Sequence, residues 1–100
     1  MNTFKVDLNI LDVCCCKCSK SRSEKSVTII NSSTVIPLQN CYYLKVAYVS
    51  TNRALIIIKK DYYYIIRFVF LDIPTNICLP TPDNCTTHYL TITATSIATN

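Results

Sequence analysis

The sequence predicts an all-β protein: a single small β-sandwich or jelly-roll-like domain with an extended N-terminal arm. The chain is rich in β-branched and aromatic residues, with seven tyrosines in 100 residues, and this composition favours strands over helices. Short apolar stretches alternate with turn-forming residues. Half of the residues are hydrophobic, which is enough to build one core at this length. Glycine is absent from the sequence, so turns with positive φ must use Asn or Asp.

Residues 3–13 alternate between apolar and polar side chains. Phe4, Val6, Leu8 and Ile10 would face one way, and Lys5, Asp7 and Asn9 the other. This period of two predicts a strand with one buried face. The strand could be the first of the protein's own sheet, or it could be added to the sheet of a neighbouring subunit. The polar residues 19–26 favour the neighbour, because eight residues can span about 26–29 Å when extended.

The remainder of the chain is read as a succession of short strands. They are expected at residues 27–30, 35–36, 41–50, 54–58, 62–71 and 89–97. Residues 62–71 are apolar on both faces, which predicts a strand that is central or covered on both sides. Residues 72–87 contain three prolines and are expected to form a long loop. The chain is therefore divided into a connector arm (residues 1–26), with a cysteine cluster and a basic linker, and a β-sandwich body (residues 27–100).

Seven cysteines are the most unusual feature of the sequence. Cys14, Cys15, Cys16 and Cys18 lie in the arm, and Cys41, Cys78 and Cys85 lie in the body. Side chains of an extended chain alternate between faces, so Cys14 and Cys16 would face one way and Cys15 the other. An odd number leaves at least one thiol free or bonded to another chain. All seven are candidates for inter-subunit disulfides; an arm that folds back and bonds to its own body is the alternative.

Zinc binding is a competing interpretation of the same residues. Cys15 and Cys18 have C-x-x-C spacing, and Cys85 and His88 have C-x-x-H spacing. Together they make a Cys₃His set of the kind that Zn²⁺ binds tetrahedrally. Otherwise no metal or cofactor is expected.

Charge and the remaining polar residues exclude several functions. The formal net charge is +4, and four of the ten basic residues lie between residues 17 and 25: Lys17, Lys20, Arg22 and Lys25. This run is interpreted as a solvated linker, and the tyrosines as core or interface residues, so no nucleic-acid partner is expected. One histidine and six scattered acidic residues offer no catalytic pair by spacing, so an enzyme is not expected. Neither a membrane span nor a signal peptide is expected from the sequence.

The segment from Leu11 to Cys18 resembles the N-terminal connector of subunits of Bacillus-type endospore appendages, which carries an aliphatic residue, a Cys-Cys pair and a further cysteine. Leu11 or Val13 would match the aliphatic position, two of Cys14, Cys15 and Cys16 the pair, and Cys18 the later cysteine. The segment beginning at Tyr43 is similar to a body strand of those pilins. This chain departs from them in its third consecutive cysteine, its longer arm, its basic linker and its lack of glycine. The resemblance implies jelly-roll subunits whose connectors form disulfides with other subunits of a fibre.

The sequence thus predicts a structural protein that assembles with copies of itself into a helical filament. Strand addition would join the subunits and disulfides would link them covalently. The fibre would be extracellular or on a cell or spore surface, reached without a classical signal peptide, because disulfides persist in oxidising surroundings. The alternatives are a small zinc-stabilised binding module and a secreted monomeric domain held by disulfides.

Overall fold

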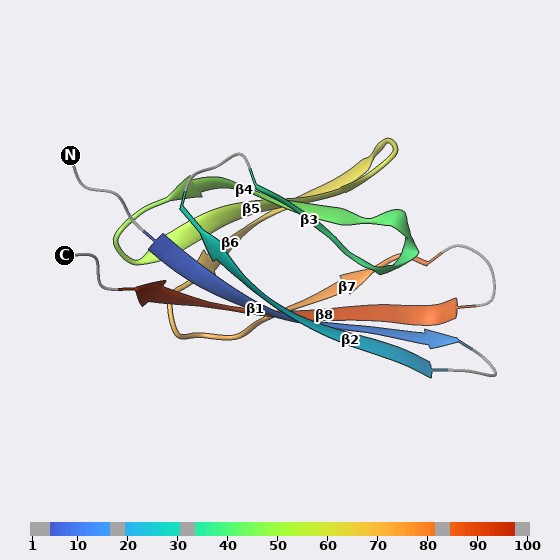
Figure 1. Ribbon diagram of the computed structural model, residues 1–100. Coiled ribbons are helices and arrows are strands. Elements are labelled where there is room, and N and C mark those ends of the chain that lie inside the picture. The colour runs from blue at the N-terminus through green and yellow to red at the C-terminus, as the bar shows by residue number, and fades with distance from the viewer. Residues whose placement is uncertain (1–4, 17–19, 31–33, 82–84, 98–100) are drawn as a thin grey trace.

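The computed structural model of the protein is a β-sandwich of two four-stranded sheets, and it describes residues 5–16, 20–30, 34–81 and 85–97 (Figure 1). Sheet A contains β1 (Lys5–Cys16), β2 (Lys20–Ile29), β7 (Thr75–Leu79) and β8 (Cys85–Ile97). Sheet B contains β3 (Val35–Pro37), β4 (Tyr43–Val49), β5 (Arg53–Lys60) and β6 (Tyr63–Phe70). The predicted all-β sandwich is confirmed.

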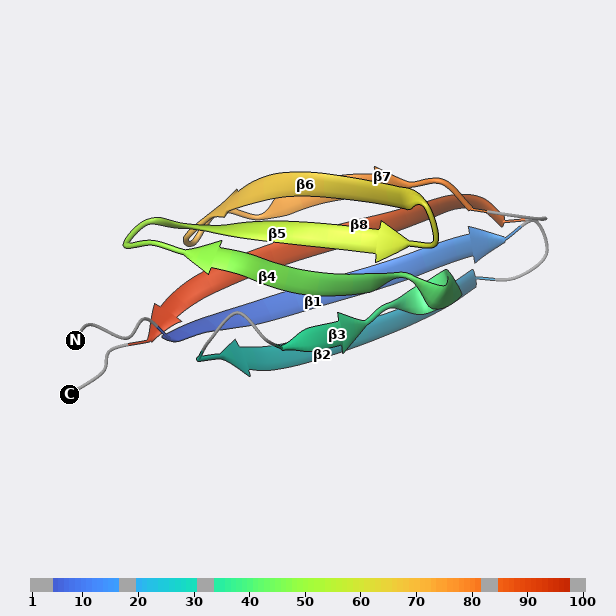
Figure 2. The same ribbon diagram turned by 90° about the horizontal axis from the view of Figure 1, so that it is seen from above.

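Strands that follow one another in the chain also lie side by side. The order is β2-β1-β8-β7 in sheet A and β3-β4-β5-β6 in sheet B, and neighbouring strands within each sheet are antiparallel. The chain changes sheet after β2 and again after β6, so each change lies at one edge of the sandwich (Figure 2). This is an up-and-down order, whereas a jelly roll is built from Greek keys. A short 3₁₀ helix, η1 (Gln39–Cys41), joins β3 to β4. Within the described ranges, no helix is long and apolar enough to cross a membrane.

The sequence predicted a connector arm at the N-terminus, but the described part of this segment belongs to the sandwich itself. β1 is an inner strand of sheet A and pairs with β2 on one side and β8 on the other. Its alternation is as predicted, since Val6, Leu8 and Ile10 are buried. A strand with alternating residues buries one face whether it belongs to its own sheet or is added to the sheet of a neighbouring subunit. The pattern alone could therefore not distinguish these two arrangements.

The expected basic linker is also a strand. β2 covers residues 20–29 and forms an edge of sheet A. Arg22 and Glu24 form an exposed ion pair on it, with 2.9 Å between Nη2 and Oε1. Farther along, the Ser26 hydroxyl donates to Asn9 and the Thr28 hydroxyl to Asp7, both on β1. An edge strand with a solvated face can be polar and still pair through its backbone, which is why composition suggested a linker.

Two other expectations are corrected by the topology. Residues 62–71, expected to form a strand that is central or covered on both sides, contain β6, which is an edge strand with an exposed outer face. The expected loop of residues 72–87 contains β7 and the beginning of β8. Proline is compatible with strand ends and edge strands. Pro74 and Pro80 accordingly flank β7, which is itself an edge strand.

The core lies between the two sheets and is almost entirely aliphatic. Its buried side chains alternate along the strands, as on Leu44, Val46, Ile56 and Ile58. Regular alternation along β4 would place Tyr48 on the same face as Leu44 and Val46, but Tyr48 is 57% exposed. A register shift between Val46 and Tyr48 in the pairing of β4 with β5 turns it outward.

The two faces of sheet B should respond differently to truncation. Ile56 on β5 is fully buried, whereas Val35 on β3 is 53% exposed. We expect Ile56→Ala to lower the free energy of unfolding by about 2–5 kcal/mol, because it removes core contacts and leaves a cavity. Val35→Ala should change it by only about 0.5 kcal/mol. Urea denaturation of both variants in reductant measures this. Equal losses would contradict the assignment of the buried face.

Candidate functional site

Cysteines distant in the sequence lie at one end of the sandwich, which we call the cysteine end. It is the end where β1 and β7 finish and β8 begins. It lies opposite the end where β1 begins and β8 finishes (Figure 1). The register places Cys16 of β1 opposite Cys85 of β8, and Cys78 of β7 opposite Tyr89 of β8. Cys41 ends η1 and follows Asn40, whose side chain contacts Cys14 of β1, so Cys41 lies at the same end. Cys18 lies outside the described residues, and only the backbone of Cys16 and Cys85 is described.

Cys14 and Cys15 of β1 lie on different faces of sheet A, as the alternation predicted. Cys14 is buried, at 3% exposure, and lies opposite His88 on the inner face of sheet A. Cys15 is half-buried and lies opposite Thr87. Its strand position places it on the outer face. A register shift follows between Cys15 and Cys16, so the regular alternation of this strand is interrupted there.

η1 packs against the cysteine end through an unusual backbone. Asn40 and Cys41 have positive φ angles of 59° and 63°. Asn40 tolerates this conformation well, but Cys41 is a less usual residue for it. The turn brings the Asn40 side-chain amide to 3.2 Å from Cys14 Sγ and leaves Cys41 exposed at the surface. One cysteine is thereby held inside and the other is presented to solvent.

Two polar side chains are buried in the core near this end. Asp12 and His88 are both 0% exposed, and His88 Nε2 lies within hydrogen-bonding distance of Asp12 Oδ1. Because a carboxylate only accepts, His88 donates through Nε2. Gln39 completes the cluster: its backbone N–H donates to Asp12 Oδ2 at 2.7 Å, and its side-chain Nε2 donates to the Asp12 carbonyl, also at 2.7 Å. These bonds fasten η1 to β1 and β8.

Tyr42 adjoins this cluster on the side of sheet B. Its hydroxyl donates to the Pro80 carbonyl at 2.7 Å, and its ring lies 5.7 Å from the His88 ring and 6.2 Å from the Tyr63 ring. Burial, and to a lesser extent the neighbouring Tyr63, raises the pKa of the Tyr42 phenol above its ordinary value of 10.0. Tyr42 therefore ties η1 to the end of β7.

The predicted zinc set is only partly described. His88 points into the core and is engaged by Asp12, while Cys15 lies on the outer face of the same sheet. The structure thus does not bring Cys15 and His88 together. Cys18 and the Cys85 side chain fall outside what is described, so the four-residue set stays a prediction. In the part of the chain that is described, no three His, Cys, Asp or Glu residues are placed to hold a metal ion. His88 Nδ1 has no hydrogen-bond partner among the described atoms.

Two exposed thiols are placed where another molecule can reach them. Cys41 and Cys78 are both free and exposed. Cys78 lies on β7, the outermost strand of sheet A on its side of the sandwich. Both residues are among the disulfide candidates predicted from the sequence. Their place at the same end as the cysteines of β1 could not be predicted, because it depends on how β1, β7 and β8 pair.

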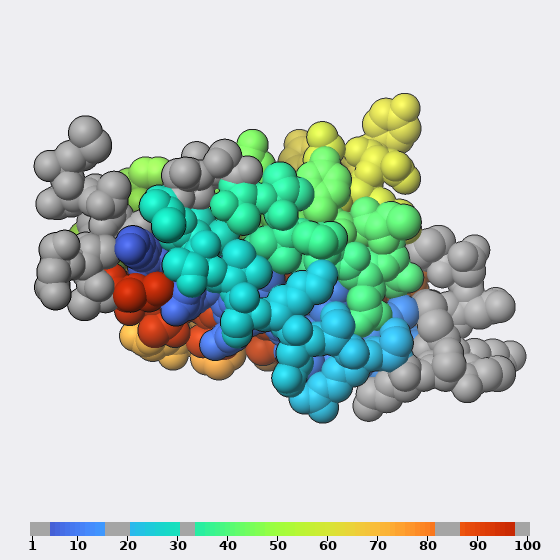
Figure 3. Space-filling model, viewed as in Figure 1, coloured from blue at the N-terminus to red at the C-terminus, as the bar shows by residue number. Residues whose placement is uncertain are grey.

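A second candidate surface is the outer face of sheet B and its edge at β6. Tyr64, Ile66, Phe68 and Phe70 of β6 are between 44% and 61% exposed. The β5–β6 turn beside them projects from the body, drawn in yellow in Figure 3, and Tyr62 on it is fully exposed. The strong apolar pattern of residues 62–71 was recognised in the sequence, but its exposure was not.

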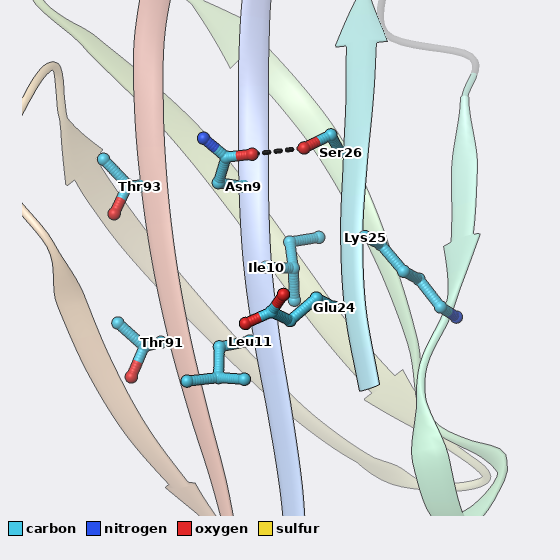
Figure 4. Close-up of a pocket in the computed structure, with 8 residues that line it drawn as sticks. All are labelled: Asn9, Ile10, Leu11, Glu24, Lys25, Ser26, Thr91 and Thr93. Atoms are coloured by element: carbon cyan, nitrogen blue, oxygen red, sulfur yellow. Dashed lines mark hydrogen bonds between the residues drawn. The ribbon is translucent and has the colours of Figure 1, made fainter. Parts of the chain in front are cut away.

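The outer face of sheet A is polar by contrast. A shallow hollow of about 310 Å³ lies over β2, β1 and β8, and Asn9, Leu11, Glu24, Ser26, Thr91 and Thr93 are among the residues that line it (Figure 4). In Figure 4 the Ser26 hydroxyl is bonded to Asn9 across β1 and β2. Thr91 donates to Asn76 on β7, and Glu24 pairs with Arg22. Most of the lining side chains are polar, whereas ligand sites are lined mainly by apolar groups.

Comparison with known proteins gives no relative. No protein-family model, curated protein or solved structure matches the chain. The function must therefore be inferred from the cysteine end and the outer face of sheet B.

The Asp12 cluster should contribute strongly to stability. Asp12→Ala removes the acceptor for His88 and for the Gln39 backbone N–H. We expect a loss of about 1–3 kcal/mol in the free energy of unfolding for each buried group left without a partner. Asp7→Ala, on the outer face of the same strand, is the matched control and should lose much less. Thermal or urea unfolding in reductant measures both, and equal losses would contradict the structural role of the cluster.

Alkaline pH should destabilise the protein partly through Tyr42. Its folded pKa is raised, so its stabilising effect is complete below pH 10.0 and is lost as the pH rises from there towards the folded pKa. We expect the free energy of unfolding to fall less in Tyr42→Phe than in the wild type between about pH 9 and about pH 10.5. Urea denaturation at both pH values measures the difference. An identical fall in the two proteins would contradict the assignment.

Proposed function

We propose that this protein is a structural subunit that assembles with copies of itself into an extracellular or surface fibre. Pairing of β6 strands would extend sheet B from one subunit to the next, and disulfides at the cysteine end would link the resulting pairs. The observation that supports this most strongly is that β6 is an edge strand of eight residues whose outer side chains are exposed and apolar.

The four edge strands are protected to very different degrees. Proteins discourage edge-to-edge pairing with charges, prolines or very short strands. β2 carries Lys20, Arg22, Glu24 and Lys25; β3 has three residues and ends in Pro37; β7 has five residues. β6 has eight residues and a single charge, Arg67. Of these edges, β6 is therefore the best suited to accept a strand from another molecule.

The pleat restricts how two β6 strands can pair. Residues directly opposite one another in a sheet lie on the same face, so each outward residue of β6 can only face another outward residue; these are Tyr64, Ile66, Phe68 and Phe70. With the twofold axis at Ile66, each Ile66 faces its copy and each Tyr64 faces Phe68 of the other subunit. With the axis at Arg67, the two guanidinium groups would be directly opposite and would repel. The register centred on Ile66 is therefore favoured over the one centred on Arg67.

A second contact is needed to make a fibre. Twofold pairing of β6 uses the same patch on both subunits and closes at a dimer. Disulfides between cysteine ends of different dimers would join the dimers into an open chain. Cys41 and Cys78 are the exposed thiols that support this step. Each cross-link would typically stabilise the assembly by about 2–4 kcal/mol, and oxidising surroundings are needed to keep it.

Reductant should separate the two contacts. In reductant we expect a dimer by sedimentation, because β6 pairing is non-covalent. After air oxidation we expect higher covalent multimers on a non-reducing gel and filaments in electron micrographs. A protein that remains monomeric at all concentrations, with and without reductant, would contradict the proposal.

Ile66→Lys should remove the dimer, because it places two positive charges directly opposite each other at the axis. Val35→Lys is the matched control: Val35 is 53% exposed and lies on β3, at the other edge of the same sheet. In reductant the first variant should sediment as a monomer and the second as a dimer. Loss of the dimer in both, or in neither, would place the interface elsewhere.

A further inference from the structure

We propose that the outer face of sheet B binds single-stranded nucleic acid. No such partner was expected from the sequence, because the basic run of residues 17–25 was interpreted as a solvated linker and the tyrosines as core or interface residues. The structure brings a different set of basic residues together with aromatic rings on one sheet face. This inference does not depend on the fibre.

The charge of sheet B has one sign. Its four strands contain Lys45, Arg53, Lys59, Lys60 and Arg67, and no Asp or Glu. Three of the five, Lys45, Arg53 and Lys59, are exposed and lie at outward positions on β4 and β5. A face that carries only positive charge attracts an anionic partner.

Aromatic rings lie beside these cations in rows across the sheet. The register places Lys59 directly between Tyr43 on β4 and Tyr64 on β6. The next row along β5 places Lys45 opposite Ile57, which faces Ile66. These two rows line a groove of about 480 Å³. Neighbouring side chains in a row are about 4.5–5.5 Å apart at Cβ, which is close enough for one nucleotide to contact a ring and an ammonium group together.

The far end of the face repeats the combination. Tyr48 and Phe68 flank Leu55 in the third row, and the Arg53 guanidinium lies 4.3 Å from the centre of the Phe68 ring. Single-stranded nucleic acids bind surfaces of this type, because bases stack on aromatic rings while phosphates contact Lys and Arg. The face therefore matches the two chemical groups that alternate along such a strand.

A second copy of the chain is a poorer occupant of this face. Two sheet B faces stacked on one another would bring Lys45, Arg53 and Lys59 of one copy towards those of the other, with no acidic residue in these strands to compensate. Like charges brought together in this way cost several kcal/mol. Pairing of β6 edges leaves the outer faces on the same side of one continuous sheet, so it does not cover them.

Fluorescence anisotropy with a labelled oligothymidylate or oligouridylate of about 16 nucleotides tests the inference, with the protein in reductant. We expect binding at low salt that weakens as salt rises. Lys45→Ala with Lys59→Ala should reduce the slope of log K against log salt by about 1.4, because each phosphate that is no longer neutralised lowers the slope by about 0.7. Tyr43→Leu and Tyr64→Leu keep apolar cover but remove a ring, and each should weaken binding by about 5- to 150-fold.

Lys5→Ala with Arg22→Ala is the matched control, because it removes two positive charges from sheet A, and it should leave the slope unchanged. The inference is overturned if no oligonucleotide binds at low salt or if this control loses as much as the Lys45 and Lys59 pair. It is also overturned if heparin binds as well and the tyrosine variants bind like the wild type, since that would indicate a general polyanion surface. Sedimentation of the same variants reports the dimer separately, so failure of binding and failure of assembly are distinguishable.

Discussion

The pairing of β1 with β8 determines where the polar and sulfur-bearing residues lie. These two strands are the inner pair of sheet A, and they remain paired from Lys5 opposite Ile97 to Cys16 opposite Cys85. Because they are antiparallel, the end of β1 meets the beginning of β8. This places Asp12 beside His88 in the core, and it brings Cys14, Cys15 and Cys16 to the end of the sandwich that also carries Cys41 and Cys78.

That arrangement divides the molecule into two ends with different chemistry. Most of the interior is aliphatic and is filled by the inward-facing residues of both sheets. At the cysteine end the same inward positions of β1 carry Asp12 and Cys14, and the contacts of Gln39 and Asn40 fasten η1 over them. A buried polar group without a hydrogen bond destabilises the fold, so the bonds from η1 to Asp12 stabilise this end. Its two positive φ angles give it the tight geometry that these bonds need.

Much of the fold could be predicted from local patterns. The alternation in β1 correctly placed Val6, Leu8 and Ile10 inside and separated the faces of Cys14 and Cys15. The absence of glycine predicted positive φ at Asn or Asp, as found at Asn40, Asp61 and Asp72, although Cys41 was not anticipated. The pairing of β1 could not be predicted, because a strand has the same period of two in its own sheet and in the sheet of a neighbouring subunit. The position of β6 was also not predictable, because an apolar strand has the same pattern whether it is central or at an exposed edge.

The proposed fibre depends above all on disulfides that join cysteines of different subunits through the cysteine end. Oxidation of an equal mixture of ¹⁴N- and ¹⁵N-labelled protein, followed by digestion and mass spectrometry, distinguishes these from disulfides within one chain. We predict disulfide-linked peptides that contain one light and one heavy partner, with Cys41 or Cys78 among them. Linked peptides that are always both light or both heavy would show that the disulfides lie within single chains, and would contradict the proposed assembly.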